Sequence, residues 1–152
     1  MKIIKVLPAT LILVFAIQAS AETLPMVPGE SIGPATLGMS EQEIEEINTS
    51  LPCAGPIKAT FKENRAVTLS TNCAGKYAIQ NSLLMGAELN RVVAKFGKPN
   101  NVILDQEYEN AVALWIRYDP MGIAFRVLAN EYGNFVQSIL IFAKTCTIAT
   151  CI

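Results

Sequence analysis

The stretch that most constrains the fold covers residues 111–127 and reads AVALWIRYDPMGIAFRV. Two runs rich in β-branched and aromatic residues, which favour strands, flank the tetrapeptide Asp119-Pro120-Met121-Gly122. In this tetrapeptide the aspartate side chain can accept from backbone amides ahead of it, proline presets φ, and glycine supplies a positive φ. The sequence therefore predicts two antiparallel strands joined by a tight turn.

The first 21 residues have the pattern of a secretory signal peptide. Two lysines precede the apolar run at residues 7–17, and Ala19-Ser20-Ala21 fits the small-x-small cleavage pattern. An uncleaved membrane anchor is the alternative, but a spanning helix needs about 20 apolar residues and this run is shorter. We therefore expect cleavage after Ala21. A periplasmic or secreted protein would remain, with a single domain over residues 22–152 and no membrane-inserted segment.

Composition excludes several classes of function. Loss of the two leader lysines would leave 10 basic against 13 acidic side chains, so we expect neither nucleic acid nor an anionic membrane as the main partner. The chain has no histidine, which excludes a Ser-His-Asp triad, a Cys-His pair and a histidine-ligated zinc. It also lacks a glycine-rich phosphate-binding motif. We expect no cofactor and no metal.

Few candidates remain for enzymatic chemistry. Glu107 and Glu109 share one side of a predicted strand, and glycosidases use a carboxylate pair, but acidic residues on the same side of a strand are more often simply solvated. A serine–lysine pair has no recognisable motif here. We therefore expect a protein that is not an enzyme.

The four cysteines are Cys53, Cys73, Cys146 and Cys151. An even number in an exported chain indicates two disulfides, and four cysteines allow three pairings. We favour Cys53–Cys73 and Cys146–Cys151 because each pair joins nearby segments. A redox or metal site is the alternative, but the chain has neither a C-x-x-C motif nor a histidine.

A helix is predicted from Ser40 onwards. Ser40 is a natural N-cap, and Glu43, three residues on, completes a capping box. Ile44, Ile47 and Leu51 then form a stripe of helical spacing that would be buried. Before this helix, residues 22–34 contain three prolines and two glycines and are expected to form an extended lead-in.

A second helix is predicted over residues 85–99. Leu89, Val92, Val93 and Phe96 fall on one face, and Gly97 follows as a helix-ending residue. Between the helices, residues 53–79 are expected to form two or three short strands, with 59–61 and 66–70 as the candidates. After the second helix, runs of strand-forming residues predict four strands, at 102–109, 111–118, 122–128 and 135–143.

A weak repeat relates the two predicted helices. Gly38 and Gly86 can be aligned 48 residues apart, and Ile44 and Val92 then each follow their glycine by six residues. This period suggests two helix-plus-sheet units, at residues 32–80 and 81–143. We expect an α+β fold with two helices packed on one face of an antiparallel sheet, either as one unit or as a tandem of two.

Three short motifs carry a resemblance to known families over residues 32–143. They are Leu37-Gly38-Met39-Ser40 with Ile44, Gly86 with Val92, and Phe96-Gly97-Lys98-Pro99. In these motifs the chain resembles β-lactamase inhibitor protein-like modules and the small outer-membrane assembly lipoproteins that share their helix-then-sheet plan. The resemblance implies a protein partner. The chain departs from the lipoproteins because it lacks a lipid-anchor cysteine after the expected cleavage site.

Alternation along the hairpin separates two faces. The face opposite the apolar positions would carry Trp115, Arg117 and Arg126, with Glu107 from the preceding strand. Trp and Arg are the side chains that most often anchor protein interfaces. The alternative is that Trp115 is buried and the two arginines only solubilise this face. The apolar positions, expected to face the helices, are Leu114, Ile116, Tyr118, Ile123, Phe125 and Val127.

The sequence therefore predicts a non-enzymatic module that binds another exported or envelope protein through the exposed sheet face, as an inhibitor, an immunity factor or an assembly partner. The alternative is a protein that binds a small ligand or an envelope component in a cavity between the sheet and the helices.

Overall fold

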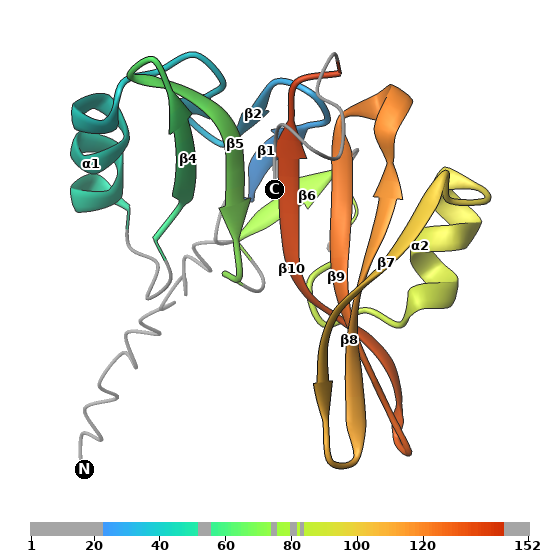
Figure 1. Cartoon of the computed structure of the whole chain (residues 1–152). Coiled ribbons are helices and arrows are strands. Elements are labelled where there is room, and N and C mark those ends of the chain that lie inside the picture. Colours follow the sequence, from blue (N-terminus) through green and yellow to red (C-terminus); the bar gives the residue numbers. More distant parts are fainter. Residues whose placement is uncertain (1–22, 52–55, 74–75, 80–81, 83, 145–152) are drawn as a thin grey trace, which may run out of the picture.

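The computed structural model describes residues 23–51, 56–73, 76–79, 82 and 84–144 (Figure 1). The predicted signal peptide lies outside the described residues, as do Cys53, Cys146 and Cys151. Cys73 is buried and disulfide-bonded, but its predicted pairing with Cys53 stays a prediction. In this part of the chain no helix is long and apolar enough to span a membrane.

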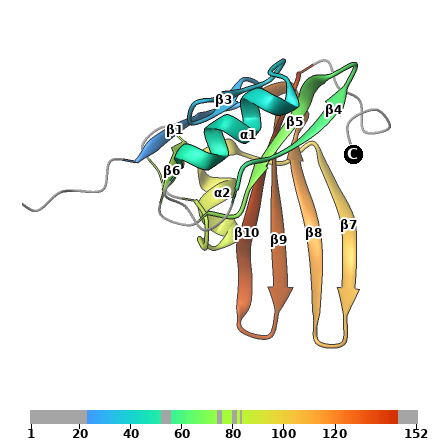
Figure 2. The ribbon, with the colours of Figure 1, turned by 90° about the vertical axis from the view of Figure 1, so that its left-hand side faces the viewer.

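The larger sheet has six strands in the order β4-β5-β10-β9-β8-β7, and every neighbouring pair is antiparallel. It is strongly curled. The ends of β7–β10 extend well beyond the helices (Figure 2). All six predicted strands occur, with ends close to those expected. The strands are β4 (Lys58–Lys62), β5 (Arg65–Thr71), β7 (Asn101–Tyr108), β8 (Ala111–Tyr118), β9 (Ile123–Asn130) and β10 (Gly133–Phe142).

A second, smaller sheet has the order β3-β2-β1-β6. Strand β1 pairs antiparallel with β2 but parallel with β6. The sequence predicted only an extended lead-in for β1 and β2, because these short segments carry no strand pattern, and it left open whether a third short strand, as at β6, occurs between residues 53 and 79. The strands are β1 (Leu24–Val27), β2 (Ser31–Ile32), β3 (Ala35–Thr36) and β6 (Tyr77–Ile79).

Helix α1 (Glu41–Ser50) begins with the predicted capping box. The Ser40 hydroxyl accepts from the Glu43 backbone N–H at 3.4 Å, and the Glu43 carboxylate accepts from the Ser40 backbone N–H at 2.8 Å. This second bond, with the Ser40 hydroxyl, lowers the pKa of the Glu43 carboxyl. Ile44 is buried from this helix, and the chain leaves it at Leu51.

Helix α2 (Leu89–Phe96) is shorter than the predicted 85–99. The missing first turn pairs with β10 instead: the Gly86 N–H donates to the Val136 carbonyl at 2.8 Å, and the Val136 N–H donates to the Ala87 carbonyl at 2.9 Å. Gly97 ends the helix with φ 79°, as its position predicted.

The segment before α1 makes the same pair of bonds to β5. The Gly38 N–H donates to the Ala66 carbonyl at 2.8 Å, and the Ala66 N–H donates to the Met39 carbonyl at 2.7 Å. Gly38 and Gly86 both have positive φ, 90° and 74°. The aligned glycines therefore hold their helices to the larger sheet by equivalent contacts, although both segments contribute to one sheet.

The main core lies between one face of the larger sheet and the two helices with the smaller sheet. Phe96 of α2 packs against Tyr118 and Phe125, with ring centroids 5.3 Å away in each case. This arrangement confirms the α+β prediction of helices on an antiparallel sheet. Buried members of the core include Met26, Ile32, Ile44, Leu69, Tyr77, Val92, Ile116, Phe125, Val127, Ile139 and Ile141.

The predicted hairpin of β8 and β9 is confirmed, with a short 3-10 helix at Asp119–Met121 and Gly122 in the left-handed region at φ 71°. The Gly122 carbonyl accepts from the N–H groups of Gly29 and Phe142, at 3.1 and 3.0 Å. The role expected for Asp119 was wrong: its two carboxylate oxygens accept from the side chains of Arg117 and Asn101 rather than from backbone amides of the turn.

Substituting alanine at Gly122 should cost more than at Gly38, although both have positive φ. A Cβ at Gly122 would meet the Phe142 carbonyl and the Gly29 backbone, whereas a Cβ at Gly38 would meet nothing within 4 Å. We expect Gly38→Ala to lower the free energy of unfolding by about 1 kcal/mol through φ alone, and Gly122→Ala by about 2–4 kcal/mol through φ and crowding. Chemical denaturation of both variants measures this. Equal losses would mean that the turn does not pack tightly on Gly29.

Candidate functional site

The register of the larger sheet fixes which side chains share the face opposite the main core. Trp115 pairs with Ile103 of β7 and with Arg126 of β9, and Arg126 pairs with Ser138 of β10. Directly paired residues lie on the same face of a sheet. Trp115 and Arg126 therefore share a face, as alternation predicted, while their role in binding stays a prediction.

Two β-bulges, one in β7 and one in β10, interrupt the regular alternation of side chains between the two faces. In β7 the register shifts between Leu104 and Gln106, so that Asp105 is an extra residue. In β10 it shifts between Val136 and Ser138, so that Gln137 is an extra residue. A bulge re-aims side chains without ending the strand. Both extra residues direct their side chains to Arg126.

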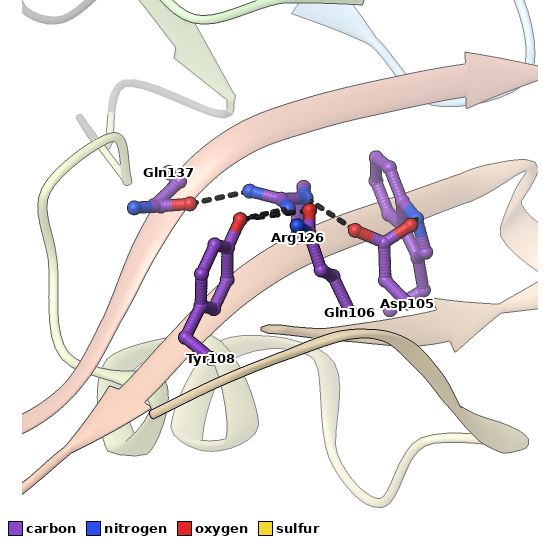
Figure 3. A network of polar contacts seen from close by, with 6 residues as sticks. Asp105, Gln106, Tyr108, Arg126 and Gln137 are labelled. Carbon is purple, nitrogen blue, oxygen red and sulfur yellow. Dashed lines mark hydrogen bonds and ion pairs between the residues drawn. The ribbon is translucent and has the colours of Figure 1, made fainter. Parts of the chain in front are cut away.

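Arg126 is the centre of a polar network (Figure 3). Its Nε–H donates to Asp105 Oδ2 at 2.7 Å, its Nη1 to Gln137 Oε1 at 2.5 Å, and its Nη2 to the Tyr108 hydroxyl at 3.3 Å. The other carboxylate oxygen of Asp105 accepts from Trp115 Nε1 at 3.0 Å. Hydrogen bonding to Tyr108, and then to Asp105, raises the pKa of Arg126, so its guanidinium stays charged.

These contacts are partly shielded from water. The side chain of Arg126 is 21% exposed and that of Asp105 is 31% exposed. Two opposed charges at 2.7 Å attract more strongly in such a setting than on an open surface, because less water screens them. The network therefore fixes the positions of the Trp115 ring and the Arg126 guanidinium relative to each other.

A groove of about 510 Å³ opens beside this network on the same face. It extends from β4 and β5 across β10 and β9 to β8, so the curl of the sheet brings distant strands to one site. We call it the groove throughout. Its lining residues are Pro56, Lys58, Ser70, Thr71, Asn72, Trp115, Arg126, Gln137 and Ser138.

Arg117 lies on the expected face of the sheet, but the expectation that it is exposed there was wrong. Its side chain is fully buried, with Nε donating to Asp119 Oδ1 at 2.7 Å and the guanidinium carbon 4.6 Å from the centre of the Phe142 ring. Its two Nη atoms have no hydrogen-bond partner among the described residues. Alternation gives the face of a side chain but not its depth. This part of the face also holds a buried apolar cluster of Ala124, Leu140 and Phe142.

The placement expected for Glu107 was also wrong. Glu107 pairs with Val112, which alternates with Ala113 and Trp115 along β8, so it lies on the other face. The physical reason is the bulge at Asp105, which reverses the alternation for the rest of β7. Asp105 takes the place that Glu107 was expected to fill.

The sequence reasoning missed three functional candidates, which are Asp105, Tyr108 and Gln137. One signal was present: aspartate is depleted from strands, so Asp105 inside a predicted strand was unusual. Nothing comparable marked Tyr108 or Gln137, because their roles depend on the register of strands that are distant in sequence.

The groups that line the groove have identifiable hydrogen-bonding roles. Both oxygens of Asp105 are already engaged by Trp115 and Arg126, so this carboxylate is not placed as a free base. Within the described ranges no three histidine, cysteine, aspartate or glutamate side chains gather as ligands for a metal. What the lining offers is one aromatic ring, charged and neutral hydrogen-bond donors, and hydroxyl groups.

Comparison with models of protein families finds no match for this chain. The same is true of comparison with curated proteins and with solved structures. The resemblance to β-lactamase inhibitor protein-like modules and to assembly lipoproteins therefore stays a prediction from the sequence.

Loss of Asp119 and loss of Arg117 should change the free energy of unfolding by different amounts, because only Arg117 is fully buried. Asp119→Asn leaves the fully buried Arg117 charge without its counter-ion, whereas Arg117→Met removes that charge and keeps an apolar contact with Phe142. We expect Asp119→Asn to lower the free energy of unfolding by about 2–3 kcal/mol, and Arg117→Met to cost clearly less. Urea denaturation of both variants decides this, and the reverse order would show that the pair itself is a net stabiliser.

Proposed function

We propose that this protein is an exported, non-enzymatic module that binds another exported or envelope protein through the groove face of the larger sheet. One observation carries the proposal: the half-buried Trp115 ring and the Arg126 guanidinium line one groove and are held in place by the same carboxylate, Asp105. Trp and Arg are the commonest anchor residues of protein interfaces.

The network supports binding because it is formed before a partner arrives. A long side chain that becomes ordered on binding costs about 0.5–1.5 kcal/mol, which reduces affinity. Arg126 already has its three nitrogens engaged by Asp105, Gln137 and Tyr108. Trp115 is likewise held by its indole N–H. Trp115 and Arg126 can therefore contact a partner with little further loss of side-chain conformational entropy.

Export is supported by the signal-peptide pattern at residues 1–21 and by the even number of cysteines. The resemblance in the Leu37-Gly38-Met39-Ser40 and Phe96-Gly97-Lys98-Pro99 motifs points in the same direction, because the families concerned are exported and bind proteins.

A small polar ligand is the second candidate, and the size of the groove favours it. A volume of about 510 Å³ lies within the range of about 300–1,000 Å³ that is common for ligand pockets. The groove is on the sheet face away from the helices, whereas the small-ligand alternative from the sequence placed a cavity between sheet and helices. Its open position on a sheet face suits a protein segment better.

Truncation of Trp115 tests the proposal. We expect Trp115→Ala to weaken partner binding by about 2 kcal/mol or more, roughly 30-fold in Kd. Because Trp115 is only partly buried, the loss of stability should stay below the 3–5 kcal/mol that is typical of a core tryptophan. Affinity capture from envelope extract followed by mass spectrometry identifies the partner, and titration with that partner gives the Kd.

Tyr132→Ala is the matched control, since it removes another aromatic ring that is 80% exposed and lies outside the groove. It should leave binding unchanged. A partner that binds the wild type and Trp115→Ala equally well would refute the proposal. Capture of no protein, together with a small molecule that protects the wild type from thermal unfolding, would favour the second candidate.

A further inference from the structure

The charge of the groove differs from that of the whole chain. The full sequence carries a net charge of −1, with 13 acidic side chains. The groove lining instead contains two cations, Lys58 and Arg126, and none of its described residues is acidic. A local positive site on an acidic protein attracts negative ligands selectively.

Lys58 carries most of this excess charge. It lies on β4 and is exposed, and its side chain makes no hydrogen bond or ion pair with the rest of the described chain. The charge of Arg126 is largely balanced by Asp105, whose Oδ2 lies 2.7 Å from the Arg126 Nε and which is not among the lining residues. The guanidinium nevertheless keeps N–H groups beyond the three that Asp105, Gln137 and Tyr108 accept.

The neutral groups of the lining also favour an acceptor-rich ligand. The amide oxygen of Gln137 is used by Arg126, which leaves its amide N–H groups as the available donors. The side chains of Ser70, Asn72 and Ser138 line the groove without a hydrogen bond to the described residues, so each can donate to a ligand.

The Trp115 ring and the Lys58 ammonium group lie on strands at opposite ends of the groove. Lys58 and Trp115 lie on β4 and β8, which are separated by four inter-strand spacings, roughly 19 Å along a flat sheet and less along a curled one. An extended chain covers roughly this distance with about six residues. A ligand that contacts both ends is therefore a chain segment rather than a single anion.

We propose that the groove takes an acidic polypeptide segment, with carboxylates at Lys58 and at the donors of Arg126 and Gln137, and an apolar side chain on the Trp115 ring. This inference rests on the proposed protein-binding function and names the chemistry of the partner.

Trp115 is the one tryptophan of the chain, so its emission reports directly on the groove. The probe is a capped peptide with two glutamates at one end, two glycines in the middle and two phenylalanines at the other end. Matched peptides carry glutamines or lysines in place of the glutamates. We expect a saturable change in tryptophan emission with the glutamate peptide. The glutamine peptide should bind about tenfold or more weakly, because it lacks the carboxylates that accept charge-assisted hydrogen bonds.

Lys58→Ala should weaken the glutamate peptide severalfold and leave the glutamine peptide unchanged. Lys62→Ala is the matched control, because Lys62 is an exposed lysine on the same strand that does not line the groove. Raising the salt from about 0.01 to about 0.15 M, which shortens the screening length from about 30 to about 8 Å, should weaken the glutamate peptide only.

Equal binding of the glutamate and glutamine peptides, no binding of either, or no effect of Lys58→Ala would overturn this inference. Its failure can be separated from failure of the proposed function. If a captured partner depends on Trp115 but is bound through a segment without acidic residues, the protein-binding proposal survives and the acidic specificity does not. Citrate that binds as tightly as the glutamate peptide would also overturn it, in favour of a small anion.

Discussion

The candidate site depends on one guanidinium that residues of two other strands hold in place. Arg126 extends from β9 and binds Asp105 and Tyr108 of β7 and Gln137 of β10, while Asp105 also holds the indole of Trp115 on β8. Two of these partners, Asp105 and Gln137, are the extra residues of β-bulges. Without the shift in β7, Tyr108 would lie on the opposite face of the sheet, and Arg126 would lose one of its three acceptors.

The two arginines of the β8–β9 hairpin show that one face of the sheet contains two different environments. Arg117 lies beside Phe142 and the buried Ala124 and Leu140, and it is itself fully buried. Arg126, on the next strand, is 21% exposed and lines the groove. Arg117 forms one ion pair and packs on the Phe142 ring inside the protein. Arg126 instead keeps part of its side chain exposed in the groove. The other face of the sheet carries the main core, and the proposed recognition site is on the groove face.

The elements that local chemistry decides could be predicted from the sequence. The Asp119–Met121 turn with Gly122, the Ser40 capping box and the end of α2 at Gly97 all occur as expected. What failed depended on distant pairing. The smaller sheet needs β6 beside β1, the first turn of α2 is lost to Val136, and the bulge at Asp105 moves Glu107 to the other face. Alternation placed Trp115 and Arg126 together correctly but gave no information on the burial of Arg117.

The most direct test of this account places a photoreactive amino acid at the rim of the groove and at a matched site on the other face. Asn72 is an exposed residue of the groove lining, and Val102 of β7 is 57% exposed and paired with the core residue Ile116 on the opposite face. On illumination of cells that produce each variant, the account predicts a covalent adduct with an envelope protein from position 72 and none from position 102. An adduct from position 102 alone would contradict the assignment of recognition to the groove.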